Sequence, residues 1–181
     1  MQAWEKAGEP REEKIGWRKL THKSFVQPDG KVSDFSTYGG VSDQAAGVIA
    51  ITPDNMIVIA EQFRPGPETV MQEIPGGGVE PGEDPLVAAM RELREETGYT
   101  SGDVVYLGSI PRDAYMNGVW HYYLAQNCLK TEIAKLDESE FVDVKLISIG
   151  GLIRNAKTGR MSDPAAVLMA YDLLNHTAAE S

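Results

Sequence analysis

Three glutamates are spaced so that they would share one face of a helix. Glu92, Glu95 and Glu96 stand at positions i, i+3 and i+4 of a segment that follows Asp84-Pro85 and stops at Gly98. An Asp cap, a Pro at the first helical position and a Gly just past the end predict a helix between them. Like charges within one turn repel each other, and a divalent cation bound to their oxygens removes that penalty. The spacing therefore indicates either a metal site or an acidic helix face exposed to solvent.

Residues around this helix supply counter-charges and a loop. Arg91 and Arg94 alternate with the glutamates, and Glu83 lies just before the helix, from where it can fold back toward the carboxylate face. The glycine triplet Gly76–Gly78 precedes it, and glycine lets backbone come close to a metal ion or a pyrophosphate. A site with only oxygen donors favours Mg²⁺ or Mn²⁺ over zinc.

The full pattern resembles the signature of the Nudix hydrolase family. Gly77 is followed after five residues by Glu83 and, after seven more, by Arg91-Glu92-Leu93-Arg94-Glu95-Glu96-Thr97-Gly98-Tyr99. Seven fixed residue types and two apolar ones should recur by chance in roughly one chain in a million of this length. The resemblance implies an α/β (α+β) fold in which a Nudix-type mixed sheet is sandwiched between helices, here with an N-terminal β-hairpin extension.

Within that resemblance each residue of the signature has an expected role. Arg91 is similar to the arginine that orients a catalytic glutamate through an ion pair. Glu95 would be a metal ligand or a proton acceptor, and Glu83 resembles the carboxylate that ties the loop to the helix through metal or water. Glu92 and Glu96 look like the principal ligands. The complete set of expected ligands is Gly77, Glu83, Glu92, Glu95 and Glu96.

This set of residues suits the cleavage of a diphosphate. A pyrophosphate is stable because its anionic oxygens repel an incoming nucleophile. Mg²⁺, or Mn²⁺ in its place, neutralises those oxygens, positions a water and stabilises the leaving phosphate, while a carboxylate takes the proton of the water. We therefore expect magnesium-dependent hydrolysis of a phosphoanhydride bond.

Outside the signature the chain is similar to the ADP-ribose pyrophosphatase branch of the family. The segments Glu61-Gln62-Phe63-Arg64-Pro65 and Glu73-Ile74-Pro75-Gly76-Gly77 match the approach to the signature in that branch. Its arginine and glutamate there contact substrate, so Arg64 and Glu73 are expected to do so here; a surface arginine at a strand end is the alternative for Arg64. The resemblance implies hydrolysis of ADP-ribose to AMP and ribose 5-phosphate.

Two further regions bear on the base and the substrate. The segment Glu138-Ser139-Glu140-Phe141 resembles a late acidic loop of that branch, which makes Glu140 the first candidate for the general base and Glu138 the second; a solvated loop is the alternative. The region 111–118 lacks the branch's Ser-Pro-Gly element. There Tyr115 could stack on a base or ribose, or simply pack, and Arg112 could bind a terminal phosphate. This departure keeps GDP-mannose, UDP-sugars and dinucleoside polyphosphates open as substrates.

The rest of the sequence predicts the elements that must position these residues. Gln27-Pro28-Asp29-Gly30 and Pro53-Asp54 each separate two β-type segments and indicate hairpins. Ser148 can cap a short helix that ends near Gly159, and Asp163-Pro164 starts a helix to about Asn175. The last helix has an apolar face of Val167, Leu168, Tyr171 and Leu174. Strands are predicted at residues 17–25, 31–38, 44–52, 55–63, 70–74, 104–110, 119–126 and 141–147.

The first fifteen residues are polar, so we expect them to be loosely held. We expect residues 1–43 to form an N-terminal β segment, which the resemblance links to dimerisation, and residues 44–181 to form the hydrolase domain.

Composition limits the class of protein and its partners. The chain has 17 Lys and Arg against 27 Asp and Glu, a net charge of −10 that disfavours binding to nucleic acid. Its one cysteine, Cys128, lies in an apolar stretch, so we expect it to be buried and unable to form an intramolecular disulfide. No secretory signal and no apolar run of about 20 residues is visible. We expect a cytoplasmic homodimer that acts on a small nucleotide sugar, with no membrane partner.

A function of another class is also consistent with the signature. The domain could be a sensor that binds a nucleotide sugar without cutting it. A sensor has no need for the complete set of metal-binding carboxylates, and this sequence has all of them.

Overall fold

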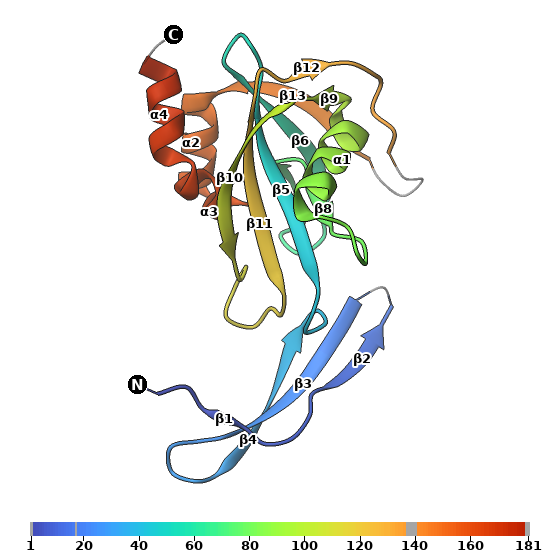
Figure 1. Ribbon diagram of the computed structural model, residues 1–181, viewed down its shortest axis with the longest axis vertical. Helices are drawn as coiled ribbons and strands as arrows, with labels where there is room; N and C mark the ends of the chain where they lie inside the picture. The colour runs from blue at the N-terminus through green and yellow to red at the C-terminus, as the bar shows by residue number, and fades with distance from the viewer. Residues whose placement is uncertain (1, 17, 137–140, 180–181) are drawn as a thin grey trace. The chain divides into compact units, whose positions relative to one another are not determined.

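The computed structural model describes residues 2–16, 18–136 and 141–179, and confirms a mixed α+β fold (Figure 1). The chain divides into two compact units. The first consists of Met1–Gln44 and Ile110–Trp120, and the second of Ala45–Ser109 and His121–Ser181. The segment Ile110–Trp120 is thus added to the N-terminal β segment expected from the sequence.

The first unit contains a four-stranded antiparallel sheet. Strand β3 (Arg18–Val26) pairs with β4 (Val32–Tyr38), which confirms the first predicted hairpin. The turn between them contains Gly30 at φ 85°, a conformation that favours glycine. Strands β1 (Glu5–Lys6) and β2 (Arg11–Ile15) also pair with β3.

The expectation that the first fifteen residues would be loosely held was wrong. Both β1 and β2 are exposed along their whole length, so they show no alternation of apolar and polar residues. Backbone pairing with β3 holds both strands in place instead. Trp4 also packs on Phe35, with 6.2 Å between the ring centroids. Pairing of this kind needs no apolar pattern that a sequence could show.

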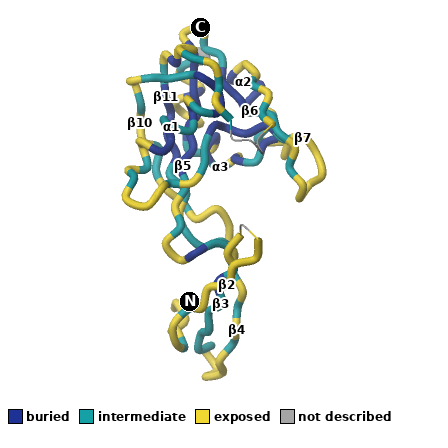
Figure 2. The backbone as a smooth tube through the Cα atoms, turned by 90° about the vertical axis from the view of Figure 1, so that its right-hand side faces the viewer, coloured by how far each residue is buried: buried dark blue, intermediate teal, exposed yellow. Residues whose placement is uncertain are grey.

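The second unit is built on a seven-stranded sheet in the order β10-β11-β5-β6-β13, with β7 paired to β6 and β8 to β5. Helix α1 lies on one face of this sheet and helices α2 to α4 on the other (Figure 1). The buried residues gather in β5, β6 and β11 (Figure 2). The strands are β5 (Gln44–Ile51), β6 (Met56–Arg64), β7 (Thr69–Glu73), β8 (Gly76–Gly78), β10 (Asp103–Ile110), β11 (Val119–Gln126) and β13 (Asp143–Ser148).

Among the described residues of the second unit, three short strands were not predicted. The glycine triplet forms β8 and pairs with β5, so close that a Cβ at Gly76 would lie 2.5 Å from the carbonyl oxygen of Ala46. Strands β9 (Tyr99–Thr100) and β12 (Leu129–Lys130) pair with each other. A run of glycines and a two-residue strand offer no periodicity, which explains why the sequence did not indicate them.

Helix α1 (Pro85–Thr97) begins and ends where the sequence predicts. Asp84 accepts a hydrogen bond from the backbone N–H of Leu86 at 2.8 Å, and Gly98 has φ 76° at the C-terminal end. The helix packs Ala88, Ala89 and Leu93 onto β5 and β11 residues in one core cluster, which also contains the buried thiol of Cys128, as expected. This packing fixes the rotation of α1 and therefore the direction of its glutamates.

Substituting Gly98 should destabilise the fold more than substituting Gly159, the corresponding glycine after α2. Both have positive φ, which costs an alanine about 1–2 kcal/mol. A Cβ at Gly98 would also lie 2.1 Å from the carbonyl oxygen of Glu132, whereas one at Gly159 meets nothing within 4 Å. We expect Gly98→Ala to lower the unfolding free energy by a further ~1–3 kcal/mol in urea titrations. Equal losses in the two variants would contradict this account.

The C-terminal helices differ in part from the prediction. Helix α2 (Ile149–Thr158) is capped by the Ser148 hydroxyl as expected. The predicted helix after Asp163-Pro164 is instead two helices, α3 (Pro164–Met169) and α4 (Tyr171–Ala179). Of the predicted apolar face, Val167 and Leu174 are buried, whereas Leu168 is 76% exposed and Tyr171 is 40% exposed. No helix in the described ranges combines the length and apolar character needed to cross a membrane.

Candidate active site

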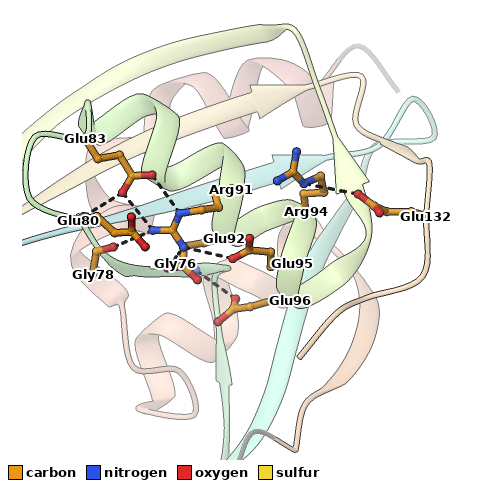
Figure 3. Close-up of polar contacts among 10 residues, drawn as sticks. All are labelled: Gly76, Gly78, Glu80, Glu83, Arg91, Glu92, Arg94, Glu95, Glu96 and Glu132. Carbon is orange, nitrogen blue, oxygen red and sulfur yellow. Dashed lines mark hydrogen bonds and ion pairs between the residues drawn. The ribbon is translucent and has the colours of Figure 1, made fainter. Parts of the chain in front are cut away.

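One arginine of α1 holds three carboxylates and a loop carbonyl together (Figure 3). Arg91 donates from Nε and Nη2 to the two carboxylate oxygens of Glu83, at 3.0 and 3.2 Å. Its Nη1 donates to Glu92 at 2.8 Å and to Glu95 at 3.2 Å, and its Nη2 also donates to the carbonyl oxygen of Gly78 at 3.0 Å. The structure therefore gathers three of the expected ligands, Glu83, Glu92 and Glu95, around one guanidinium.

The ion pairs change the protonation equilibria of both partners. The bonds to Glu83, and after them those to Glu92 and Glu95, raise the pKa of the Arg91 guanidinium well above its usual range. In return, Arg91 lowers the pKa of Glu83, with help from the backbone N–H of Glu80, which donates to the same carboxylate at 2.9 Å. Glu83 therefore joins the loop to the helix through a direct ion pair with Arg91.

This lowered pKa gives a testable dependence of stability on pH. A carboxyl group whose pKa falls on folding stabilises the fold above its ordinary value, here 4.5, and loses that contribution as the pH falls through the lower folded value. Glu83→Gln should therefore unfold at lower urea than wild type at pH 7, and the two proteins should converge toward about pH 3. An unchanged difference in acid, measured by circular dichroism, would show that the ion pair is not its source.

Two carboxylates lie against the glycine strand. A Cβ at Gly77 would lie 2.4 Å from an oxygen of Glu92, so this carboxylate occupies the space that any side chain would fill. Glu96 is 8% exposed and accepts a hydrogen bond from the backbone N–H of Gly76 at 3.2 Å. The absence of side chains in β8 thus lets its backbone come into contact with the carboxylate face of α1.

The carboxylates are engaged with protein donors rather than gathered around a cation. In the part of the chain that the structure describes, no three Asp, Glu, His or Cys side chains converge closely enough to hold a metal ion. Arg91 stands between Glu83, Glu92 and Glu95 (Figure 3). Arg91 binds one of the two carboxylate oxygens of Glu92 and one of the two of Glu95, so a cation at this site would not require these ion pairs to break.

Arg64 and Glu73, the predicted substrate contacts, bind each other. Arg64 Nε donates to Glu73 at 2.6 Å and Nη2 donates to the second carboxylate oxygen, which makes a two-pronged pair. Glu73 raises the pKa of Arg64, and the charges of Glu96 and Asp163 raise it further. This pair therefore lies within electrostatic reach of Glu96 in α1. The side chain of Arg64 is 43% exposed, which leaves the guanidinium accessible to an anion.

The other predicted contacts lie elsewhere in the chain. Arg112 and Tyr115 belong to the first compact unit, whereas the carboxylates belong to the second. The guanidinium of Arg112 lies 4.4 Å from the ring centroid of Trp120, and Tyr115 is 57% exposed at a cavity of about 490 Å³. Glu138 and Glu140, the candidate bases, lie outside the described residues.

Asp163 is a residue near the site that the sequence did not single out. It is 5% exposed and accepts a hydrogen bond from the Ser162 hydroxyl at 2.5 Å. Its negative charge helps to raise the pKa of Arg64. The dipeptide Asp163-Pro164 is also an ordinary helix start, so its sequence carried no separate signal for a site.

Known proteins resemble the chain over most of its length. A family model described as "NUDIX domain" matches residues 41–168. A protein named methanol dehydrogenase activator, from Bacillus methanolicus, is 40% identical over 126 residues, 68% of each chain. An ADP-ribose pyrophosphatase from Bacillus subtilis (strain 168) is 32% identical over 121 residues, 66% of this chain and 65% of the relative.

The architecture also has a match among solved structures. A crystal structure of an ADP compounds hydrolase superposes with a TM-score of 0.80. The match covers 98% of this chain and 97% of the other, at 18% identity. At that identity the likeness concerns the fold alone.

Proposed function

This chain belongs to the Nudix hydrolase family and is a pyrophosphohydrolase, and from that premise we propose that it hydrolyses ADP-ribose to AMP and ribose 5-phosphate. The observation that carries the proposal is the position of the Arg64–Glu73 pair within electrostatic reach of Glu96. A guanidinium that can bind a phosphate is thereby combined with carboxylates that suit a cation. The 32% sequence identity with the ADP-ribose pyrophosphatase from Bacillus subtilis supports ADP-ribose as the substrate over other nucleoside diphosphates.

We propose Mg²⁺ as the cofactor, with Mn²⁺ able to replace it. The groups at β8 and α1 that could bind a metal are carboxylate and carbonyl oxygens, which fits a hard divalent cation. The residues that would hold it are Gly77, Glu83, Glu92, Glu95 and Glu96. When bound, the cation supplies charge neutralisation at the diphosphate oxygens.

The residues of the chain then have separate tasks. Arg64 exchanges one of its bonds to Glu73 for a bond to a phosphate oxygen, which orients the diphosphate. Arg91 keeps Glu95 in place through its bond at 3.2 Å. Glu95, whose side chain is 39% exposed, accepts the proton of the attacking water. Glu140 and Glu138 are the alternative bases.

A panel of substrates tests the proposal. The purified chain with Mg²⁺ is offered ADP-ribose, GDP-mannose, UDP-glucose, NADH and diadenosine polyphosphates, and the released phosphates are measured. We expect ADP-ribose to have the highest kcat/KM. Faster turnover of another compound would replace the substrate, and turnover of none would refute the proposal. Chelation of Mg²⁺ should abolish hydrolysis, and activity that persists would exclude the cofactor.

We also propose that the chain works in the cytoplasm as a homodimer joined through its N-terminal β segment. The roles of Tyr115 in stacking on a base or ribose and of Arg112 in binding a phosphate remain predictions. Light scattering of the full chain and of a variant lacking residues 2–16 tests the assembly. A dimer that survives this deletion unchanged would place the interface elsewhere.

One relative favours a second function. Its name, methanol dehydrogenase activator, and its 40% identity support a role of this chain in raising the activity of such a dehydrogenase. Purified methanol dehydrogenase assayed with the wild-type chain and with Glu96→Gln tests that role. Acceleration by wild type but not by the variant would connect activation to hydrolysis, and no acceleration by either would exclude it.

A further inference from the structure

The strand that carries Glu73 is attached to the C-terminal segment at Gln72. Gln72 is 5% exposed and pairs with Glu61 of β6 along one edge of β7. Along the other edge its N–H donates to the carbonyl oxygen of Arg160 at 3.0 Å, and its own carbonyl oxygen accepts from the N–H of Ser162 at 3.1 Å. The neighbour of Glu73 is therefore held from both sides.

The side chain of Gln72 also joins the two sides. Alternate residues of a strand point to opposite faces, so Gln72 and its partner Glu61 share the face opposite to Glu73 and Arg64. Gln72 Nε2 donates to Glu61 at 2.7 Å, and Asn155 of α2 donates through Nδ2 to Gln72 Oε1. The three side chains form a continuous relay from α2 across β7 to β6.

The chemistry of the three groups fixes the direction of this relay. A carboxylate only accepts, so Glu61 requires the NH₂ group of Gln72 to face it. The Gln72 oxygen must then face Asn155, which has to donate. A residue that offers only an acceptor at position 155 would leave the oxygen of the buried Gln72 facing another acceptor. The free-energy cost of that unpaired oxygen is larger than the contribution of the hydrogen bond itself.

From this arrangement we propose that Gln72 and Asn155 are positioning residues. The hydrogen bonds from Asn155 to Gln72 and from Gln72 to Glu61 hold β7 in the position in which Glu73 faces Arg64, and so set the affinity for substrate. The proposal rests on the proposed function, in which Arg64 and Glu73 contact the diphosphate compound. It assigns to α2 an indirect part in substrate binding.

Asn155→Asp tests the relay because it replaces the donor with an acceptor of nearly the same shape. We expect the KM for ADP-ribose to rise about tenfold while kcat changes little, because binding is altered and the carboxylates of α1 are not. Asn175→Asp, on the exposed surface of α4, controls for the added charge. Asn155→Ala removes the donor without adding charge and should shift KM in the same direction.

Reversing the relay should restore the affinity. In the double variant Glu61→Gln/Asn155→Asp, the amide introduced at position 61 can donate to the Gln72 oxygen, and the carboxylate introduced at position 155 can accept from the Gln72 NH₂ group. The KM of this double variant should return toward that of wild type, whereas Glu61→Gln alone, which keeps an acceptor, should change KM less than Asn155→Asp does. Such a recovery is not expected from a merely structural role, which would lower the melting temperature without the split between KM and kcat.

The outcomes separate the two proposals. If wild type hydrolyses none of the panel compounds, the proposed function fails and this proposal fails with it. If wild type is active but Asn155→Asp and Asn155→Ala keep its KM, or the double variant stays as impaired as Asn155→Asp, the relay does not position the substrate site and this proposal alone is overturned.

Discussion

Glu96→Gln should hydrolyse ADP-ribose about three orders of magnitude more slowly than wild type, with the loss in kcat. Glu96 is buried against β8, and its carboxylate is one of the two principal ligands we propose for the cation. Stabilisation of transition-state charge by a metal ion amounts to several kcal/mol, and each 1.36 kcal/mol is a factor of ten in rate. Glutamine keeps an oxygen that can accept from the N–H of Gly76, so the fold should survive.

Three measurements check this expectation. Steady-state kinetics with Mg²⁺ give kcat and KM, calorimetric titration gives the affinity for Mg²⁺, and the melting temperature reports the fold. Glu9→Gln, exposed between β1 and β2, is the control for removing one negative charge. A rate for Glu96→Gln within a few-fold of wild type would remove Glu96 from the list of ligands.

Arg91→Lys should lower kcat about a hundredfold. Lysine has three donors on a single nitrogen, so it cannot reproduce bonds that three nitrogens of Arg91 make to Glu83, Glu92, Glu95 and Gly78. Glu92 and Glu95 would lose their common orienting group, and a misplacement of about 1 Å at a catalytic group can cost 10²-fold in rate. The loss should appear even at saturating Mg²⁺, because the charge at position 91 is unchanged.

The same helix offers a matched control. Arg94 lies three residues further along α1, has a side chain that is 49% exposed and makes a longer ion pair with Glu132, at 3.5 Å. Arg94→Lys should therefore retain nearly the wild-type kcat. If both substitutions reduced kcat equally, the effect would come from helix α1 in general and not from the carboxylates around Arg91.

Local signals in the sequence were enough to predict the helix that carries the site. Asp84, Gly98 and the glutamates between them lie within one segment, and capping depends only on near neighbours. The ion pair of Arg91 was expected to orient one glutamate, and the structure gives it three. The additional partners depend on how the loop before α1 folds back, which the spacing of residues does not determine.

Contacts between distant segments were the part that the sequence could not show. Arg64 and Glu73 were each expected at a site, but their mutual pair comes from the register of β6 and β7. Asn155 reaches Gln72 over 83 residues, through polar side chains that follow no periodic pattern. The strands β1 and β2 are a further case, because a ladder of backbone bonds leaves no trace in residue types.

The grouping around Arg91 also has a consequence for stoichiometry. One guanidinium and the four carboxylates proposed as ligands, Glu96 included, carry a net charge of −3, so one Mg²⁺ leaves a charge of −1. A second ion would make the site positive, and the anionic oxygens of the nucleotide would then have to offset that charge. Ion uptake and nucleotide uptake should consequently be coupled, each tightening the other in titrations at low ionic strength.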